Sequence, residues 1–164
     1  MKELTWEDRQ APLTDEQILG AELLLGVKFP EDYKACLKLN HGCQALESEY
    51  SLEVNGSTFD GGHGWGMILG LDPRNPESIL GYLRLHPQGI VPISLDGGGN
   101  RICLDYRRSE VPTLVYYDTH LDEEDNYIQL CETFSQLVEA CFIPEDVIVW
   151  RRKEGLYLPP YVED

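Results

Sequence analysis

Residues 14–42 read TDEQILGAELLLGVKFPEDYKACLKLNHG and decide the fold of this chain. A helix begins at a capping box, because the Thr14 hydroxyl can accept the amide N–H of Gln17 while the Gln17 side chain reaches back. Apolar residues then recur at helical spacing, and Gly26 is suited to the left-handed conformation that ends a helix. The predicted inner face consists of Ile18, Ala21 and Leu25.

A second helix follows directly. Pro30 has no amide N–H to leave unpaired and suits the first position of a helix. The predicted inner face of this helix consists of Tyr33, Cys36, Leu37 and Asn40. Glu22 lies among the apolar residues of the first helix, where a carboxylate costs free energy unless it has a partner. We expect it to accept backbone N–H groups from a neighbouring loop, and a catalytic role is the alternative.

The rest of the chain predicts strands with helices on either side. Residues 50–54 alternate and run into Asn55-Gly56, a hairpin turn signal that is followed by a return strand. Further strands are predicted at 90–95, 101–106, 113–118 and 147–150, and further helices after residue 75 and at 134–142. Helices at both ends of a mostly antiparallel set of strands predict one compact α+β domain. We expect a lead-in over 1–12, the domain over 13–150 and a C-terminal arm over 151–164.

Several of these segments resemble one known family. The string LLGVKFPEDYK at 24–34, ending in Asn40-His41-Gly42, is similar to the N-terminal signature of the SMI1/KNR4 family of the SUKH superfamily. Residues 90–105 resemble its central hairpin, 114–120 the next strand and 133–138 its closing helix. The resemblance covers roughly residues 13 to 142 in the right order. It departs at His41, where a glycine is common, and at Thr133, where serine is usual.

The resemblance implies a fold and a function. It implies a non-enzymatic binding module with the fold of that family. Bacterial members are commonly immunity proteins, encoded beside secreted toxins whose C-terminal domains are often nucleases. A second implied role, as in fungal members, is a regulatory scaffold in cell-wall synthesis. The compact chain lacks the long flanks usual in those members, so the first role is favoured.

Composition bounds the class of protein. A chain of 164 residues is about one domain. Residues 1–8 have no apolar core of a secretory signal, and no window approaches the run of about 18 apolar residues that spans a bilayer. The cysteines are odd in number and scattered, which favours reduced, mostly buried thiols over a disulfide framework. They are Cys36, Cys43, Cys103, Cys131 and Cys141. We therefore expect a cytoplasmic protein.

Charge is the second strong signal. The formal net charge is −16, and the segments 39–73 and 109–150 contain no Lys or Arg. Such a potential repels phosphate backbones and anionic lipids, so it argues against direct nucleic-acid or membrane binding. It attracts a basic protein partner and speeds encounter with it. Solubility alone accounts equally well for any single acid, but two long base-free segments favour a binding surface.

We expect the partner-binding surface to combine acids near 47–60 with the loop 118–125. Aromatic residues are enriched at binding hot spots, which adds Trp65, although strand aromatics more often belong to the core. A plain solvated loop remains the alternative for the acidic run. The expected contact residues are Glu47, Glu49, Asp60, Trp65, Asp118, His120, Asp122, Glu123, Glu124 and Asp125.

Chemical sites are weaker candidates. The string Asp96-Gly97-Gly98-Gly99-Asn100 lacks the Lys and Ser or Thr of a phosphate loop and the ligand spacing of a calcium loop, so a hairpin turn explains it. Cys36, His41 and Cys43 have no paired Cys-x-x-Cys to complete a zinc site. We therefore predict no catalytic residue, no cofactor and no metal. An enzyme acting through Asp96, Asp105 or Asp118 is the remaining alternative, and it would need a deep pocket with a perturbed carboxylate.

Overall fold

The predicted helix pair is the first regular secondary structure in the chain. The structure is a computed structural model that describes residues 1–61, 64–121 and 126–162. Helix α1 (Asp15–Leu25) starts at the predicted capping box, in which Thr14 and Gln17 bond in both directions. It ends at Gly26, whose φ of 69° is left-handed, as the sequence predicts.

Helix α2 (Glu31–Asn40) differs from prediction at its start only. Pro30 is the residue before the helix, with a ψ of 142°, rather than its first helical residue. The predicted inner face is confirmed, since Tyr33, Cys36, Leu37 and Asn40 are all buried. The Asn40 side chain donates to the carbonyl of Cys36 at 3.1 Å and accepts from Arg9 at 3.0 Å, which satisfies a buried amide.

Glu22 connects the two helices. The residue is 8% exposed, and its carboxylate accepts the backbone N–H of Phe29 at 2.7 Å, in the link that leads to α2. The Nζ of Lys34, one turn into α2, lies 3.2 Å from the same oxygen. The predicted structural role is thus confirmed, because the carboxylate is paired with a backbone donor and a cation of the neighbouring elements.

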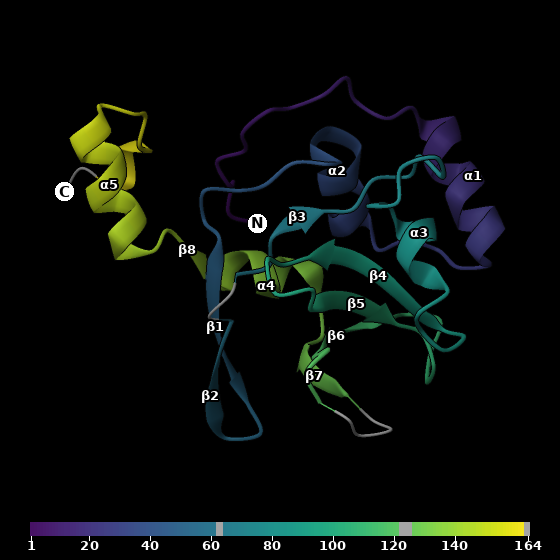
Figure 1. Ribbon diagram of the computed structural model, residues 1–164. Coiled ribbons are helices and arrows are strands. Elements are labelled where there is room, and N and C mark those ends of the chain that lie inside the picture. Colours follow the sequence, from purple (N-terminus) through teal and green to yellow (C-terminus); the bar gives the residue numbers. More distant parts are fainter. Residues whose placement is uncertain (62–63, 122–125, 163–164) are drawn as a thin grey trace.

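The strands of the described residues form two antiparallel sheets (Figure 1). The larger has the order β3-β4-β5-β6-β7, with β3 (Met67–Ile68), β4 (Ile90–Leu95), β5 (Arg101–Asp105), β6 (Thr113–Tyr117) and β7 (Tyr127–Cys131). The smaller has the order β2-β1-β8, with β1 (Glu49–Val54), β2 (Ser57–Asp60) and β8 (Cys141–Phe142). Asn55 and Gly56 turn the predicted hairpin with φ values of 51° and 78°.

Two shorter helices complete the body. Helix α3 (Ile79–Leu83) starts at Ser78, whose hydroxyl accepts the N–H of Gly81. Helix α4 (Phe134–Ala140) starts at a capping box of Thr133 and Gln136. The sequence predicts this helix to run to residue 142, which is wrong by two residues. Cys141 and Phe142 instead leave the helix and pair with β1.

The core lies between the larger sheet and helices α1, α2 and α4. Apolar residues that alternate along β4 to β6 face these helices, which places the main core in one layer. The largest buried side chains include Tyr33, Phe134, Trp65, Ile93, Ile102 and Leu104. Together the elements form one α+β domain, as predicted.

The opposite face of the larger sheet carries a polar cluster centred on Arg101. Its guanidinium is buried, lies 4.9 Å from the ring of Tyr117 and 5.2 Å from that of Tyr82, and donates to His86 Nε2 at 2.9 Å. The other ring nitrogen of His86 lies 2.6 Å from the Tyr127 hydroxyl. Because Arg101 can only donate, His86 accepts at Nε2 and carries its proton on Nδ1.

This cluster predicts a pH dependence. Burial, followed by the charge of Arg101, lowers the pKa of His86 from 6.5 to about 4. The unfolded chain therefore binds the proton first, and the stability from the neutral ring is lost as the pH falls from 6.5 toward 4. We expect a loss of about 1 kcal/mol, because solvent screens the partly exposed ring. Urea unfolding across this range should show a smaller decline for His86→Gln, and an equal decline in both proteins would contradict the assignment.

The prediction of a strand at residues 147–150 is wrong. Residues 147–150 belong to helix α5 (Glu145–Glu154), which Pro144 precedes and Gly155 ends with a φ of 65°. Acids in its first turn and bases in its last turn match the helix dipole, and these end signals outweigh the strand preference of Val147, Ile148 and Val149. The expected boundary at 150/151 therefore falls inside a helix.

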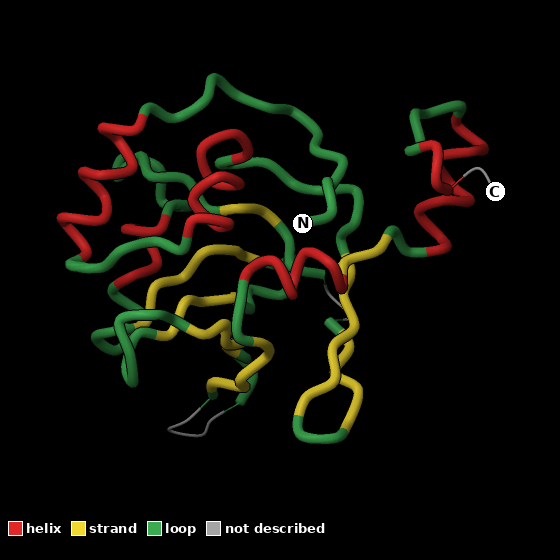
Figure 2. Tube along the Cα trace, turned by 180° about the vertical axis from the view of Figure 1, so that it is seen from behind, coloured by secondary structure: helices red, strands yellow, loops and turns green. Residues whose placement is uncertain are grey.

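The two ends of the chain meet. Residues 5–7 lie along 44–46, where Leu46 N–H donates to the Thr5 carbonyl at 2.8 Å. Helix α5 and the 3-10 turn η1 (Pro160–Val162) contact the N-terminal segment, although the Cα trace of the C-terminal helix stands apart from the sheets (Figure 2). Arg151 pairs with Glu7 at 3.0 Å, and Lys2 lies 5.8 Å from the Tyr161 ring. In the described part of the chain, no helix has the length and apolar character to cross a bilayer.

Candidate partner-binding surface

Two of the expected contact residues are inside the protein. Glu47 is 0% exposed, and its carboxylate accepts from the Thr5 N–H at 2.8 Å, the Thr5 hydroxyl at 3.1 Å and the Tyr161 hydroxyl. Trp65 is 1% exposed and donates to the Glu47 carbonyl at 2.9 Å. Their assignment to the contact surface is wrong, because both are buried and already paired. Glu47 instead holds the N-terminal and C-terminal segments against the domain, because it accepts hydrogen bonds from Thr5 and Tyr161.

The other described residues of the set lie at the surface. Asp60 and His120 are exposed, whereas Glu49 and Asp118 are partly buried. Asp118 accepts the N–H of His120 at 2.9 Å and lies 3.3 Å from its Nδ1. Burial, with smaller effects of Asp96 and Asp118, raises the pKa of the neighbouring Tyr116 to about 12. Asp122, Glu123, Glu124 and Asp125 lie outside the described residues.

The β1–β2 hairpin packs beside the larger sheet. The ring of Phe59 on β2 lies 5.2 Å from that of Tyr116 on β6, and 6.3 Å from that of Tyr50. Asp60 follows Phe59, and Asp118 lies two residues after Tyr116. The aromatic contact therefore brings the strands that carry the two predicted acidic regions together.

A groove lies beside the β1–β2 hairpin, and we call it the acidic groove after the residues that line it. It has a volume of about 840 Å³ and runs between the β1–β2 hairpin, β7 and α4. Leu52, Leu130 and Ala140 give it apolar walls. Of the described residues that line it, three are glutamates and none is Lys or Arg. The full lining is Leu52, Glu53, Val54, Asn55, Gln129, Leu130, Cys131, Glu132, Ser135, Gln136, Glu139 and Ala140.

The carboxylates of the acidic groove come from both base-free segments. Glu53 comes from 39–73, whereas Glu132 and Glu139 come from 109–150. All three are exposed. Glu53 accepts from the Thr58 hydroxyl at 2.7 Å, and Glu139 accepts from the backbone N–H of Lys2 at 2.5 Å. The contact residues expected from the sequence include none of these glutamates, although Glu53 lies within the expected region 47–60. The lack of Lys and Arg in the two segments was the signal that pointed to them.

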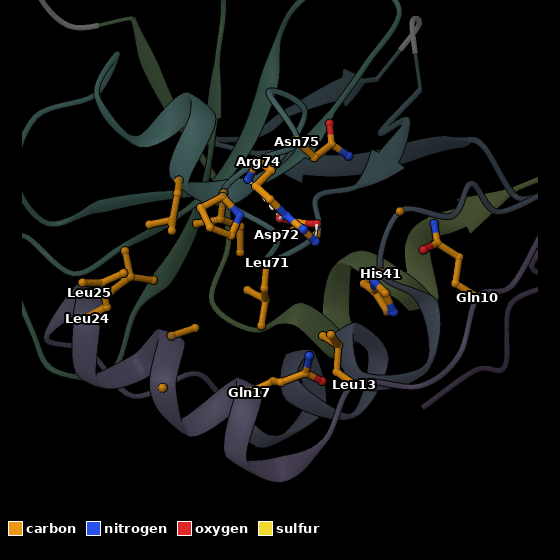
Figure 3. A pocket seen from close by; sticks show the side chains of 17 residues that line it. Gln10, Leu13, Gln17, Leu24, Leu25, His41, Leu71, Asp72, Arg74 and Asn75 are labelled. Carbon is orange, nitrogen blue, oxygen red and sulfur yellow. Dashed lines mark hydrogen bonds and ion pairs between the residues drawn. The ribbon is translucent and has the colours of Figure 1, made fainter.

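A second cleft, separate from the acidic groove, lies against α1 (Figure 3). It has a volume of about 630 Å³ and lies between α1, the segment with Gln10 and Leu13, and the loop 70–75. Asp72 is bound to Arg74 at 2.9 Å, and that cation lowers the pKa of the carboxyl group. The His41 ring lies 2.9 Å from the Ala11 carbonyl and therefore donates to it. Neither group is placed as the acid or base of a catalytic pair.

The glycine turn is structural. The Asp96 carboxylate accepts the N–H groups of Gly98 at 2.8 Å and Asn100 at 2.9 Å, and the Asn100 amide at 3.2 Å. Asn100 in turn accepts the N–H of Thr119 at 3.0 Å, which holds the turn against the end of β6. The predicted hairpin turn between β4 and β5 is confirmed, and the Asp96 oxygens are occupied by protein donors.

This arrangement predicts a stability effect without a calcium effect. Asp96→Asn should lower the free energy of unfolding by about 1 kcal/mol, because one acceptor of the charged turn becomes a donor facing the Asn100 amide. Thermal unfolding should be the same with millimolar calcium or with a chelator. A rise of the melting temperature on adding calcium would contradict the structural role of Asp96.

Burial makes most of the thiols weak nucleophiles. All five are free, and four are buried. Burial raises the pKa of the Cys36 and Cys141 thiols to about 12 and that of Cys131 to about 11, which disfavours the nucleophilic thiolate. Within residues 1–61, 64–121 and 126–162, no three His, Cys, Asp or Glu side chains are grouped to hold a metal ion.

Comparison with known proteins agrees with the fold. Residues 12–140 match the model of the SMI1 / KNR4 family (SUKH-1). The chain is 27% identical over 180 aligned positions to the SPbeta prophage-derived uncharacterized protein YokK of Bacillus subtilis (strain 168). That alignment covers 95% of this chain and 89% of the relative. No solved structure matches the chain. The match extends over most of the domain, and the chain therefore belongs to the SMI1 / KNR4 family (SUKH-1).

Proposed function

We propose that this protein is an immunity protein that binds a basic toxin domain and blocks its action, without chemistry of its own. At the level of the family, membership supports an immunity-like binding role. The finer proposal is that the partner is a nuclease and that the acidic groove takes part in the contact. A nuclease needs a cationic surface to hold phosphates, and that surface is complementary to a strongly anionic domain.

One observation carries the proposal. The acidic groove gathers glutamates from both base-free segments around apolar walls. Apolar walls provide desolvated contact area, and the carboxylates around them select a partner with Lys or Arg at matching positions. A partner seated there would cover β7 and the hairpin, next to the surface that carries Asp60, Asp118 and His120.

The loop 118–125 remains part of the proposed surface. Four of its acids follow each other in sequence, and the strands that lead into it lie beside the hairpin. Long-range attraction depends on the summed charge near the contact rather than on one ion pair. We therefore expect the groove glutamates and the loop acids to act together on the rate of association.

The proposal is tested through the genomic neighbourhood. One of the reading frames next to the gene should encode a large secreted protein with a toxin-like C-terminal domain. Expression of that domain alone should stop growth, and co-expression of this protein should restore it. A toxin domain from an unrelated locus is the control. Failure to restore growth, despite soluble expression of both proteins, would refute the pairing.

A further inference from the structure

Helix α1 presents an unpartnered apolar face. Leu19, Leu23 and Leu24 are 55%, 74% and 69% exposed, an unusual cluster on one 11-residue helix. The added Cβ of an alanine at Gly20 would meet nothing within 4 Å, so the centre of this face is also open. A glycine inside a helix costs about 1 kcal/mol relative to alanine. That cost is offset where a second helix approaches closely.

The face lies between two hollows. Gly20 and Leu24 line the cleft of Figure 3, whereas Leu19 and Leu23 line a second hollow of about 800 Å³ that reaches Val27 and Tyr106. The leucines therefore form a ridge with a groove on each side. This shape suits a helix of the same kind, because the ridge of one helix packs into the groove of another.

The charges along α1 favour a second copy over a uniformly basic partner. Glu16 is exposed at its N-terminal end, where Asp15 is already paired with Lys38 at 2.6 Å, and Lys28 is exposed just after its C-terminal end. Gly20 lies midway along the helix. A two-fold axis at Gly20 places two antiparallel α1 helices together, so that Glu16 of one copy lies at the same end of the contact as Lys28 of the other, twice by symmetry. A partner with only positive charge meets Lys28 unfavourably.

We propose that the α1 face is a homodimer interface, in which two copies pack α1 against α1 antiparallel about Gly20. This interface is separate from the acidic groove, which lies on α4, β7 and the hairpin. The net charge of −16 on each copy opposes association, so added salt should strengthen the dimer. Binding of a basic partner has the opposite salt dependence.

Sedimentation equilibrium tests the proposal. Wild type should form a dimer at micromolar concentrations and become tighter from low to high salt. Leu23→Glu should weaken the dimer at least about tenfold, because it places a charge in the apolar contact. Leu85→Glu is the matched control, since Leu85 is 52% exposed and lies outside α1. It should leave the dimer unchanged.

A charge exchange makes the test specific. Glu16→Lys lowers the size of the net charge yet should weaken the dimer about fivefold, because it puts a second positive charge at the end of the contact that already holds Lys28 of the other copy. The E16K/K28E double variant keeps the net charge of −16 and should restore wild-type affinity. Melting curves show that each variant is folded.

Three results would overturn the proposal: a monomer at all concentrations and salts, equal effects of Leu23→Glu and Leu85→Glu, or a tighter dimer for Glu16→Lys. A monomer whose binding to the toxin domain is lost in Leu23→Glu would assign the face to the toxin instead.

Discussion

Glu22→Ala is expected to lower the free energy of unfolding by about 3 kcal/mol. The change removes the acceptor of the Phe29 N–H and leaves Lys34 without its buried counter-charge. A donor that loses its partner inside the protein keeps its full desolvation cost, which is why the effect exceeds that of a surface ion pair. Urea unfolding at neutral pH measures it.

Two variants separate the contributions. Glu22→Gln keeps an oxygen that can accept from Phe29 but removes the charge, so its effect should be intermediate. Glu31→Gln is the matched control, since Glu31 also pairs with Lys34 at 3.1 Å but is 89% exposed, and it should hardly change stability. All three variants should still bind the partner while folded. Equal effects of Glu22→Gln and Glu31→Gln would contradict the structural role.

Neutralising the acidic groove is expected to slow binding of the toxin domain. The triple change of Glu53, Glu132 and Glu139 to Gln should lower the association rate constant about tenfold or more at low salt, because it removes three negative charges at the contact. It should also reduce the salt dependence of that rate. The toxin domain can be purified as an active-site variant that cells tolerate. Stopped-flow mixing of this domain with each protein measures the association rate constant and its salt dependence.

A matched triple variant controls for net charge. Glu77, Glu145 and Glu154 are exposed and lie outside the groove, so changing them to Gln alters the net charge by the same amount. Its effect on the rate should be much smaller. A separate variant of Asp122, Glu123, Glu124 and Asp125 tests the loop. Equal rates for the groove and control variants would move the contact elsewhere on the molecule.

The sequence predicts local structure well where the signals lie within a few residues. The capping box at Thr14, the left-handed Gly26 and the Asn55-Gly56 turn each depend on neighbours in the chain, and each is found as predicted. Glu22 also belongs to this group, because its partner Phe29 is only seven residues away. The prediction followed from the cost of an apolar setting for a carboxylate.

The wrong predictions arise where local signals for helix and strand compete, or where the partner of a residue is far away in the sequence. In α5, a β-branched run favoured a strand, but Pro144, the terminal charges and Gly155 favoured a helix and prevailed. Glu47 looked like a surface acid because its partner Tyr161 is 114 residues away. Trp65 is buried by contacts with Trp6 and Phe134, which no local pattern joins.

The acidic groove shows the same limit. The sequence reveals two segments without Lys or Arg, and that pattern depends on composition alone. Which of their acids converge depends on the register of the β1–β2 hairpin and on the packing of α4 beside it. Glu53, Glu132 and Glu139 meet through tertiary structure, so only the fold identifies them.

The central claim is that this anionic domain acts by binding a cationic protein. The most direct measurement is the association rate of the purified protein with the toxin domain encoded beside it, over a range of sodium chloride concentrations. We predict a fast rate that falls steeply as salt is added, together with loss of toxin activity in the complex. A rate that does not change with salt, or a complex in which the toxin remains active, would contradict the claim.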